Sequence, residues 1–381
     1  MAGILNQPLG TAPLNAMGNG GPEPMTMRMI GIGQSIPFPG KRSLKRQTAE
    51  QEGGAAQAAV DDVRRQLRFE LESMYFELAF ADRALEIIRR NSELLGTLIS
   101  VTEARYASGS AGQQDVLKAR VEATRLAETA AELSERRTVL LAQLNALIDR
   151  PSDTPLPPVA IPDDIARRAV ARSNEEIRFT SAALGSRASG SPLKPLAELQ
   201  EAAIRGNTEL REHEAMTAVQ RLRVALAKRE HLPDIDLSIQ YGQRGSGLPD
   251  MVTATVAVPL PVFKARKQDQ VSAETEAQLA ALEAEHHEKV NALRADVVRL
   301  VSEIERARTR LALTVKATLP QSRAALASAT ASYQSGKAEF LSVLDAQASL
   351  FTLETDYYRA LTDFAKNVAE LRRVVGEEVL Q

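Results

Sequence analysis

Two long stretches of this chain carry apolar residues at helical spacing, with no glycine or proline to end a helix. They span residues 55–95 and 265–319, and Ser92 is the one polar interruption in the stripe of the first. Apolar residues in steps of three and four are typical of helices that pack lengthwise in left-handed crossings. A helix over residues 43–104 would be about 90 Å long, which exceeds the diameter of a compact domain. The sequence therefore predicts a rod or a tube.

Composition excludes several classes of function. The 47 Lys and Arg residues nearly balance 49 Asp and Glu residues, so the net charge is −2 and no basic excess is available to bind nucleic acid. The chain has no cysteine, which excludes disulfides, thiolate metal sites and thiol catalysis. No apolar run is long enough for a transmembrane helix, and the N-terminal residues lack the basic and apolar regions of a signal peptide.

Two pairs of short segments change from the helical period to alternation of apolar and polar residues. In the clearer pair, Asp234–Tyr241 and Met251–Val258 flank a turn-rich loop, which predicts a β-hairpin. The other pair, near the N-terminus, comprises residues 2–9 and 25–36. Four strands cannot close a barrel by themselves, so two hairpins with one apolar face each look incomplete.

Three methionines lie at alternate positions in the N-terminal hairpin, Met25, Met27 and Met29. Thioethers suit Cu(I), so a soft-metal site is one interpretation. The alternation is expected to place all three on the apolar face of the strand, so we favour a lipid-facing surface over a metal site.

The chain is an internal duplication. After each hairpin come two prolines, basic residues, a long helix, a tight turn and a return helix. The turns match residue for residue, Tyr106–Ala111 with Tyr333–Ala338, and the return helices open at Asp115 and Ser342. Such agreement at a fixed period indicates one structural unit used twice.

We expect six segments along the chain. They are a first hairpin (1–40), a first long helix with its return helix (41–150), a bridge containing a helix over 163–184 (151–195), a helix leading into the second hairpin (196–231), the second hairpin (232–262), and a second long helix, return helix and C-terminal tail (263–381). The helix at 196–231 has no counterpart in the first copy. We therefore expect a helix of about 35 residues, with any export signal, to precede the sequence given.

The duplicated pattern resembles the TolC-type outer-membrane factor family of Gram-negative efflux systems from Ile4 to Gly376. The most specific motifs are the Tyr-x-Ser-Gly turns, the Val-Leu-Asp-Ala sequence at 343–346 and the Tyr-Tyr-Arg-Ala sequence at 357–360. The resemblance implies a mainly α fold with a small β part. In it, three protomers each give four strands to a twelve-stranded outer-membrane barrel, and their coiled-coil helices form a periplasmic tube. Residues 25–34 resemble the CusC/CzcC-like cation-efflux branch.

The resemblance implies a passive exit duct for metal cations or drugs, with no enzyme activity and no cofactor. It also implies a homotrimer in contact with outer-membrane lipid, a periplasmic adaptor and an inner-membrane pump of the RND type. Both classes of cargo remain open. A soluble coiled-coil scaffold or adaptor is the alternative, and it explains the helical stripes but not two hairpins at equivalent places in a duplication.

By the same resemblance, four residues are candidates for an entrance gate. Asp345 corresponds to an acidic position that lines the closed aperture, where three copies would form a carboxylate ring that favours cations. The family often has a second aspartate three residues earlier, where this chain has Ser342. Tyr333 and Asp115 match positions that hydrogen-bond between neighbouring coiled coils. A solvated Asp345 and a Tyr333 that merely packs the helix tips are the alternatives.

The turns are candidate docking sites for the adaptor's helical hairpin, again by resemblance. The residues concerned are Ser108, Gly109, Ala111, Ser335, Gly336 and Ala338. A helix that reverses tightly needs a residue that tolerates positive φ, so both glycines are expected to be structural as well.

Two sets of charged or titratable residues have ordinary interpretations. The basic residues after the hairpins fit either a barrel rim near lipid headgroups or solubilising helix starts, and they are Lys41, Arg42, Lys264, Arg266 and Lys267. The histidines lack the i,i+4 spacing of a helical metal site, so we expect solvated or seam residues and no metal; they are His213, His231, His286 and His287.

Overall fold

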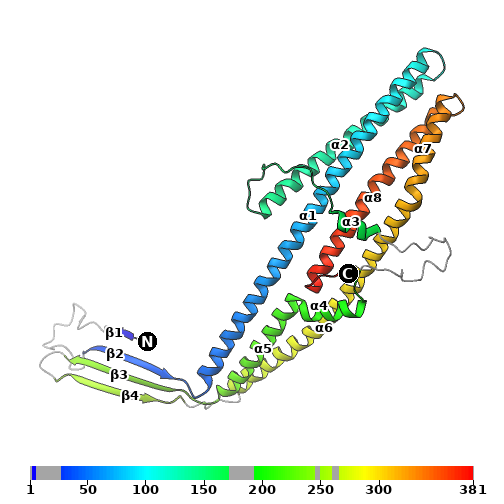
Figure 1. Cartoon of the computed structure of the whole chain (residues 1–381). Coiled ribbons are helices and arrows are strands. Elements are labelled where there is room, and N and C mark those ends of the chain that lie inside the picture. The colour runs from blue at the N-terminus through cyan, green and yellow to red at the C-terminus, as the bar shows by residue number, and fades with distance from the viewer. Residues whose placement is uncertain (1, 6–26, 171–192, 245–248, 260–265, 381) are drawn as a thin grey trace, which may run out of the picture. The chain divides into compact units, whose positions relative to one another are not determined.

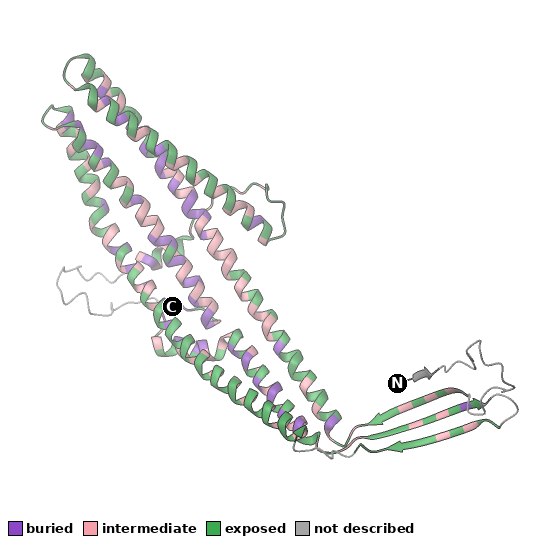
Figure 2. Cartoon of the chain, turned by 180° about the vertical axis from the view of Figure 1, so that it is seen from behind, coloured by how far each residue is buried: buried purple, intermediate pink, exposed green. Residues whose placement is uncertain are grey.

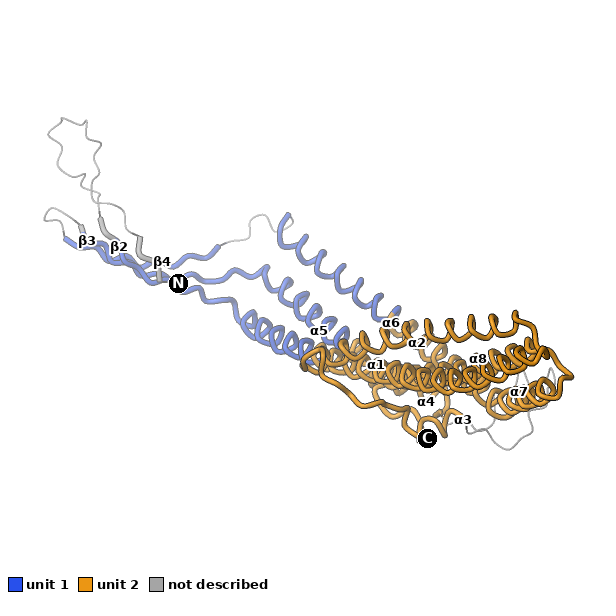
Figure 3. Tube along the Cα trace, turned by 90° about the horizontal axis from the view of Figure 1, so that it is seen from above, with its two compact units in different colours: residues 1–58, 211–288 blue, residues 59–210, 289–381 orange. Residues whose placement is uncertain are grey.

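A computed structural model describes residues 2–5, 27–170, 193–244, 249–259 and 266–380, and it is mainly helical with one small sheet (Figure 1). Its elements are β1 (Ala2–Leu5), β2 (Met27–Ile36), α1 (Lys41–Ala107), α2 (Gln113–Leu147), α3 (Asp163–Val170), α4 (Leu196–Gly206), α5 (Thr208–Arg229), β3 (Ile235–Arg244), β4 (Met251–Ala257), α6 (Gln268–Leu313), the π-helix η3 (Thr314–Thr318), α7 (Leu319–Gln334) and α8 (Phe340–Val375). Two compact units contain these elements: Met1–Ala58 with Arg211–Glu288, and Ala59–Leu210 with Lys289–Gln381 (Figure 3).

The predicted long helix and both hairpins are confirmed. Helix α1 has 67 residues, from Lys41 to Ala107, against an expected span of 43–104. Strands β1 and β2 pair in antiparallel fashion, as do β3 and β4. Helix α3 begins at Asp163 as expected, and the rest of the expected bridge helix lies outside the described residues.

The second long helix contains a π-helical turn that the sequence reading did not anticipate. Residues Thr314–Thr318 form η3 between α6 and α7, and Pro320 lies in the first turn of α7. Proline has no N–H for the helical hydrogen bond, and its ring clashes with the carbonyl four residues earlier. A wider turn just before Pro320 makes room for the ring, so the helical path continues to Gln334.

The helix expected over 196–231 is broken into α4 and α5 at Asn207. The Asn207 side-chain oxygen accepts a hydrogen bond from the Leu210 N–H at 2.9 Å, which caps the start of α5. Gly206 packs directly against the end of α8, where a Cβ would lie 2.4 Å from the Val375 carbonyl oxygen. The Gly-Asn pair was therefore a helix boundary that the prediction missed.

We expect Gly206→Ala to lower the free energy of unfolding by about 1–3 kcal/mol, since the atoms that the added Cβ would meet all belong to the backbone of Val375 and Gly376. Gly54 is the matched control, because a Cβ there meets nothing within 4 Å inside α1. Gly54→Ala should raise stability by up to about 1 kcal/mol through helix propensity. Denaturant unfolding of the detergent-solubilised protein measures both changes. Equal effects would contradict the close approach at Gly206.

Buried residues recur along the helices of the second unit (Figure 2), and most of them are apolar and form the clusters that hold this unit together. One cluster joins α3, α4, α6 and α8 around Leu300, Ile304 and Phe364. A second joins the ends of α1, α2, α7 and α8 around Leu95, Tyr333 and Phe340. The residues at the centres of both clusters are almost fully buried, so the tips of the two helical hairpins share one core.

In the first unit, four antiparallel strands form a sheet in the order β1-β2-β3-β4. Where the sheet meets the helices, Lys41 is buried and its Nζ donates to the Leu232 carbonyl and to Asp234, both at 2.7 Å. Hydrogen bonds from Lys41 and from the Phe38 N–H hold the pKa of Asp234 below its usual value. Lys41 thus fixes the sheet to the helices, and neither the lipid nor the solubilising interpretation applies to it.

Candidate functional site

The two tip turns have the same backbone structure. Gly109 and Gly336 adopt φ of +71° and +73°, as the sequence predicted. Their N–H groups donate to the carbonyls of Tyr106 and Tyr333, at 2.9 and 3.0 Å. Ser108 and Ser335 are exposed in the two turns, and Ala111 and Ala338 are half-buried. The duplicated sequence thus presents two turns of equivalent backbone geometry, although exposed Lys337 and Glu339 replace Ser110 and Gly112 in the second turn.

Tyr333 binds the tip of α1. It is buried, its hydroxyl donates to Thr102 Oγ1 at 3.3 Å, and Arg105 stacks over its ring at 4.4 Å. Arg105 Nη1 also donates to the Tyr333 carbonyl. These contacts join the end of α1 to the end of α7. We call Thr102, Arg105 and Tyr333 the tip clasp.

The clasp differs from the expected Tyr333 partner. Asp115 is half-buried at the start of α2, and the Tyr333 hydroxyl donates to Thr102 instead. Arg105 gave no signal in the sequence, because an arginine in the last turn of a helix is common for reasons of the helix dipole alone. A residue pair separated by more than two hundred positions has no local pattern to reveal it.

The other two candidate gate residues, Ser342 and Asp345, lie on the exposed face of α8 near its start. Ser342 is exposed and its hydroxyl donates to the Glu339 carbonyl at 2.7 Å, which helps to begin the helix. Asp345 is exposed, and no other described residue bonds to its carboxylate. An unpaired carboxylate on an exposed helix face is free to act on ions or on another chain.

The sheet exposes one apolar face. Register places Ile32, Ile239 and Ala254 side by side on this face, because cross-strand partners share a side. Ile32 and Ile239 are 72% and 62% exposed, and Val252 and Val256 are both 69% exposed. Such a surface is unusual for a soluble protein and indicates an apolar environment.

The methionine prediction is wrong for Met29. Met29 pairs with Gly242 and lies on the same side as Gly31, opposite to Ile30 and Ile32. The apolar residues of this strand stand at odd-numbered positions up to Met29 and at even-numbered positions from Ile30, and no β-bulge marks the change. Simple alternation therefore failed to assign the face on which Met29 lies. Met25 lies outside the described residues.

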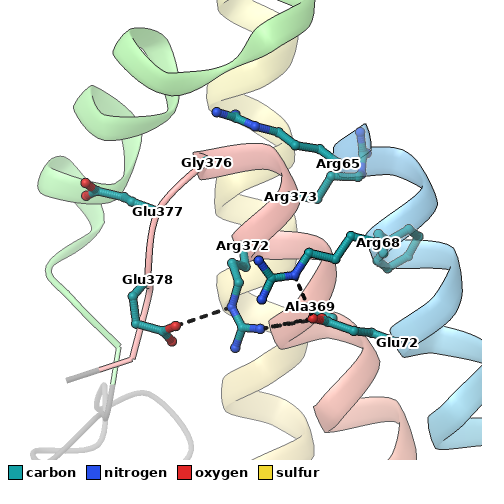
Figure 4. Close-up of a pocket in the computed structure, with 10 residues that line it drawn as sticks. Arg65, Arg68, Glu72, Ala369, Arg372, Arg373, Gly376, Glu377 and Glu378 are labelled. Carbon is teal, nitrogen blue, oxygen red and sulfur yellow. Dashed lines mark hydrogen bonds and ion pairs between the residues drawn. The ribbon is translucent and has the colours of Figure 1, made fainter. Parts of the chain in front are cut away.

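A surface pocket of about 220 Å³ lies between α1 and the end of α8 (Figure 4). Glu72 accepts from Arg68 at 3.0 Å and from Arg372 at 3.5 Å, and Arg372 lies 3.4 Å from Glu378. These ion pairs hold the segment after α8 against α1. Because the charges compensate each other inside the pocket, we assign it a structural role.

Two other features are absent from the described part of the chain. No three His, Cys, Asp or Glu side chains there form a ready metal site. No described helix is both long enough and apolar enough to cross a bilayer.

Comparisons with known proteins agree with this architecture. The family model for outer membrane efflux proteins matches residues 14–149 and 199–377. The chain is 25% identical to the cobalt-zinc-cadmium resistance protein CzcC of Cupriavidus metallidurans over 341 residues, which are 90% of this chain and 75% of that protein.

Solved channels share the fold. The outer membrane protein VceC of Vibrio cholerae superposes with a TM-score of 0.73 at 18% identity, over 92% of this chain and 80% of that one. CusC superposes with a TM-score of 0.72 at 14% identity, over 92% and 83%. The chain therefore belongs to the outer membrane efflux protein family, whose members lie in the outer membrane of Gram-negative bacteria with their helices in the periplasm.

Proposed function

We propose that the chain is one subunit of a homotrimeric channel whose twelve-stranded barrel takes four strands from each copy. The observation that carries this proposal is the incomplete sheet. Strands β1 and β4 each pair on one side only within the described sheet, and one face is apolar and exposed. Lipid tolerates neither open edges nor unpaired backbone groups, so closure by further copies removes both problems.

The helices of three copies would continue the barrel as a periplasmic tube. In this proposal the protein is a passive duct without catalytic activity, joined through an adaptor to an inner-membrane RND pump. The two tip turns dock the adaptor, because they present exposed turns of equivalent backbone geometry at the ends of both helical hairpins. The relative named as a cobalt-zinc-cadmium resistance protein supports metal cations as the cargo.

The experiment that tests the trimer is a mass measurement in detergent, combined with circular dichroism. A trimer with β content from four strands per chain supports the channel. A water-soluble, wholly helical dimer would support the scaffold alternative and end the proposal.

Within the channel, Asp345 is proposed to line the entrance with Ser342 and Asp115 nearby. We expect Asp345→Asn to lower the preference for K⁺ over Cl⁻ in a planar bilayer by about tenfold or more. A carboxylate about 8 Å from an ion is worth about 2 kcal/mol at intermediate dielectric, and three are lost together.

Asp363→Asn is the matched control, since Asp363 is another exposed carboxylate on α8, 18 residues away from the tip position. It should leave the cation preference unchanged. If Asp345→Asn also leaves it unchanged, Asp345 does not line the narrow part of the pathway.

A further inference from the structure

We propose that His213 and His286, with Glu285 as a positioning residue, form a binding site for a divalent transition-metal cation between α5 and α6. The sequence offered no such site, because the histidines are far apart along the chain and lack helical ligand spacing. The fold brings them together, with ring centroids 5.9 Å apart. All three residues belong to the first unit.

His213 is buried, and only one of its two ring nitrogens has a polar partner. Its side chain is 7% exposed, and its Nε2 lies 3.5 Å from Glu285 Oε2. Its other ring nitrogen, Nδ1, is buried without a hydrogen-bond partner. A ligating histidine commonly donates its second N–H to a carboxylate, which fixes the tautomer and leaves the opposite lone pair for the metal.

It is unfavourable to bury a ring nitrogen that has no hydrogen-bond partner. A neighbouring polar side chain, Gln220, does have partners. Gln220, two turns along the same face of α5, donates from Nε2 to both the Thr275 carbonyl and Gln278 Oε1, each at 3.0 Å. The polar contacts between α5 and α6 thus satisfy the amide donor of Gln220, whereas His213 Nδ1 has no hydrogen-bond partner. A cation at this position would supply the missing partner.

The spacing of the rings suits one shared ion. Two imidazoles on a tetrahedral cation, with metal–nitrogen bonds of about 2.1 Å, have centroids about 5 Å apart. The observed 5.9 Å therefore needs only a small movement of His286, which is half-buried. Water completes the coordination, since the described residues provide no third His, Cys, Asp or Glu in place.

A cavity lies near this position, although neither histidine lines it. This cavity of about 530 Å³ is lined by Glu212, the neighbour of His213, and by Leu282, one turn before His286. Imidazole and water ligands suit Zn²⁺, Co²⁺ and Ni²⁺ better than Mg²⁺ or Ca²⁺. The site does not depend on the cargo of the channel, because binding to the isolated protein is a separate property from transport.

Equilibrium titration of the full chain in detergent with Co²⁺, followed by its visible absorption, tests the site. We expect one ion per chain, displaced by Zn²⁺. His213→Gln and His286→Gln should each weaken binding at least tenfold, and Glu285→Gln should weaken it about 10- to 100-fold without changing the stoichiometry.

Two histidines serve as matched controls. His287 is exposed beside His286, and His231 has a similar carboxylate neighbour, Asp269 at 3.7 Å, but no second imidazole within the described contacts. Substitution of either by Gln should leave Co²⁺ affinity unchanged. Equal losses in the controls and in the site variants would overturn the proposal, as would unchanged binding in the double variant of His213 and His286.

X-ray absorption on the wild-type protein loaded with Zn²⁺ gives a result that does not depend on variants folding. Two imidazole ligands are expected. A first shell of oxygen alone would refute the site, whatever the outcome of the channel measurements.

Discussion

Replacing Arg105 by methionine is expected to raise the ratio of open to closed channels in a planar bilayer by about thirtyfold. Arg105 supplies a hydrogen bond to the Tyr333 carbonyl and a cation–π contact with its ring. Together these are worth about 2 kcal/mol, and each 1.4 kcal/mol changes an equilibrium tenfold. Methionine keeps the apolar volume but forms neither interaction. We propose that the arrangement of the two hairpin tips seen here is the closed one, and it therefore loses its main polar link.

Two control variants separate the tip clasp from general loosening of the tips. Arg120→Met removes an ion pair with Glu103 at 2.7 Å, which lies inside the first hairpin and does not join it to the second. Tyr333→Phe keeps the ring under Arg105 and loses only the bond to Thr102. Both should change channel opening much less than Arg105→Met does. Equal opening in Arg120→Met and Arg105→Met would mean that the clasp does not hold the entrance closed.

The tip shows which parts of a site the sequence can predict. The positive φ of Gly109 and Gly336 follows from a local requirement of a tight reversal, so the motif was sufficient. The partner of Tyr333 depends on how two hairpins meet, and the motif identified the tyrosine without identifying Arg105. The gating and docking roles of Asp345 and of the turns stay predictions, because they concern other chains.

The fold shows the same division between local and long-range information. The helical period placed α1 within three residues at each end, since propensity and pattern agree over its whole length. The face of Met29 was misassigned because only pairing with β3 fixes which side a residue takes. The break at Asn207 was missed because a helical stripe continued on both sides of it. The pair of His213 and His286 is likewise a product of helix packing alone.

Glu77→Gln is expected to lower the free energy of unfolding by about 2–3 kcal/mol at pH 7, less than the roughly 3–5 kcal/mol for breaking a fully buried ion pair, because its cationic partners are partly exposed. Glu77 on α1 is 12% exposed and accepts hydrogen bonds from Lys366 at 2.9 Å and Arg359 at 3.0 Å on α8. It also binds Arg136 on α2 at 3.2 Å. Loss of this one charge leaves three cations around a neutral amide.

The effect should depend on pH in a defined direction. Burial raises the pKa of Glu77, but hydrogen bonds and charges of Lys366 and Arg359 outweigh burial, so the pKa lies below its usual value. A lowered carboxyl pKa adds stability that is complete above the unfolded pKa, about 4.3, and disappears as the pH falls through the folded pKa. The wild-type protein and the variant should therefore differ fully at pH 7 and converge in acid.

Denaturant unfolding in detergent at several pH values measures the difference, with Glu86→Gln as the matched control. Glu86 pairs with Arg83 on the same helix, where both side chains are substantially exposed. Removing that pair should cost no more than about 0.5 kcal/mol at any pH. A Glu77→Gln difference that persists unchanged in strong acid would show that packing around residue 77, and not its charge, ties α1 to α2 and α8. Convergence in acid would identify one carboxylate as the common anchor of three helices.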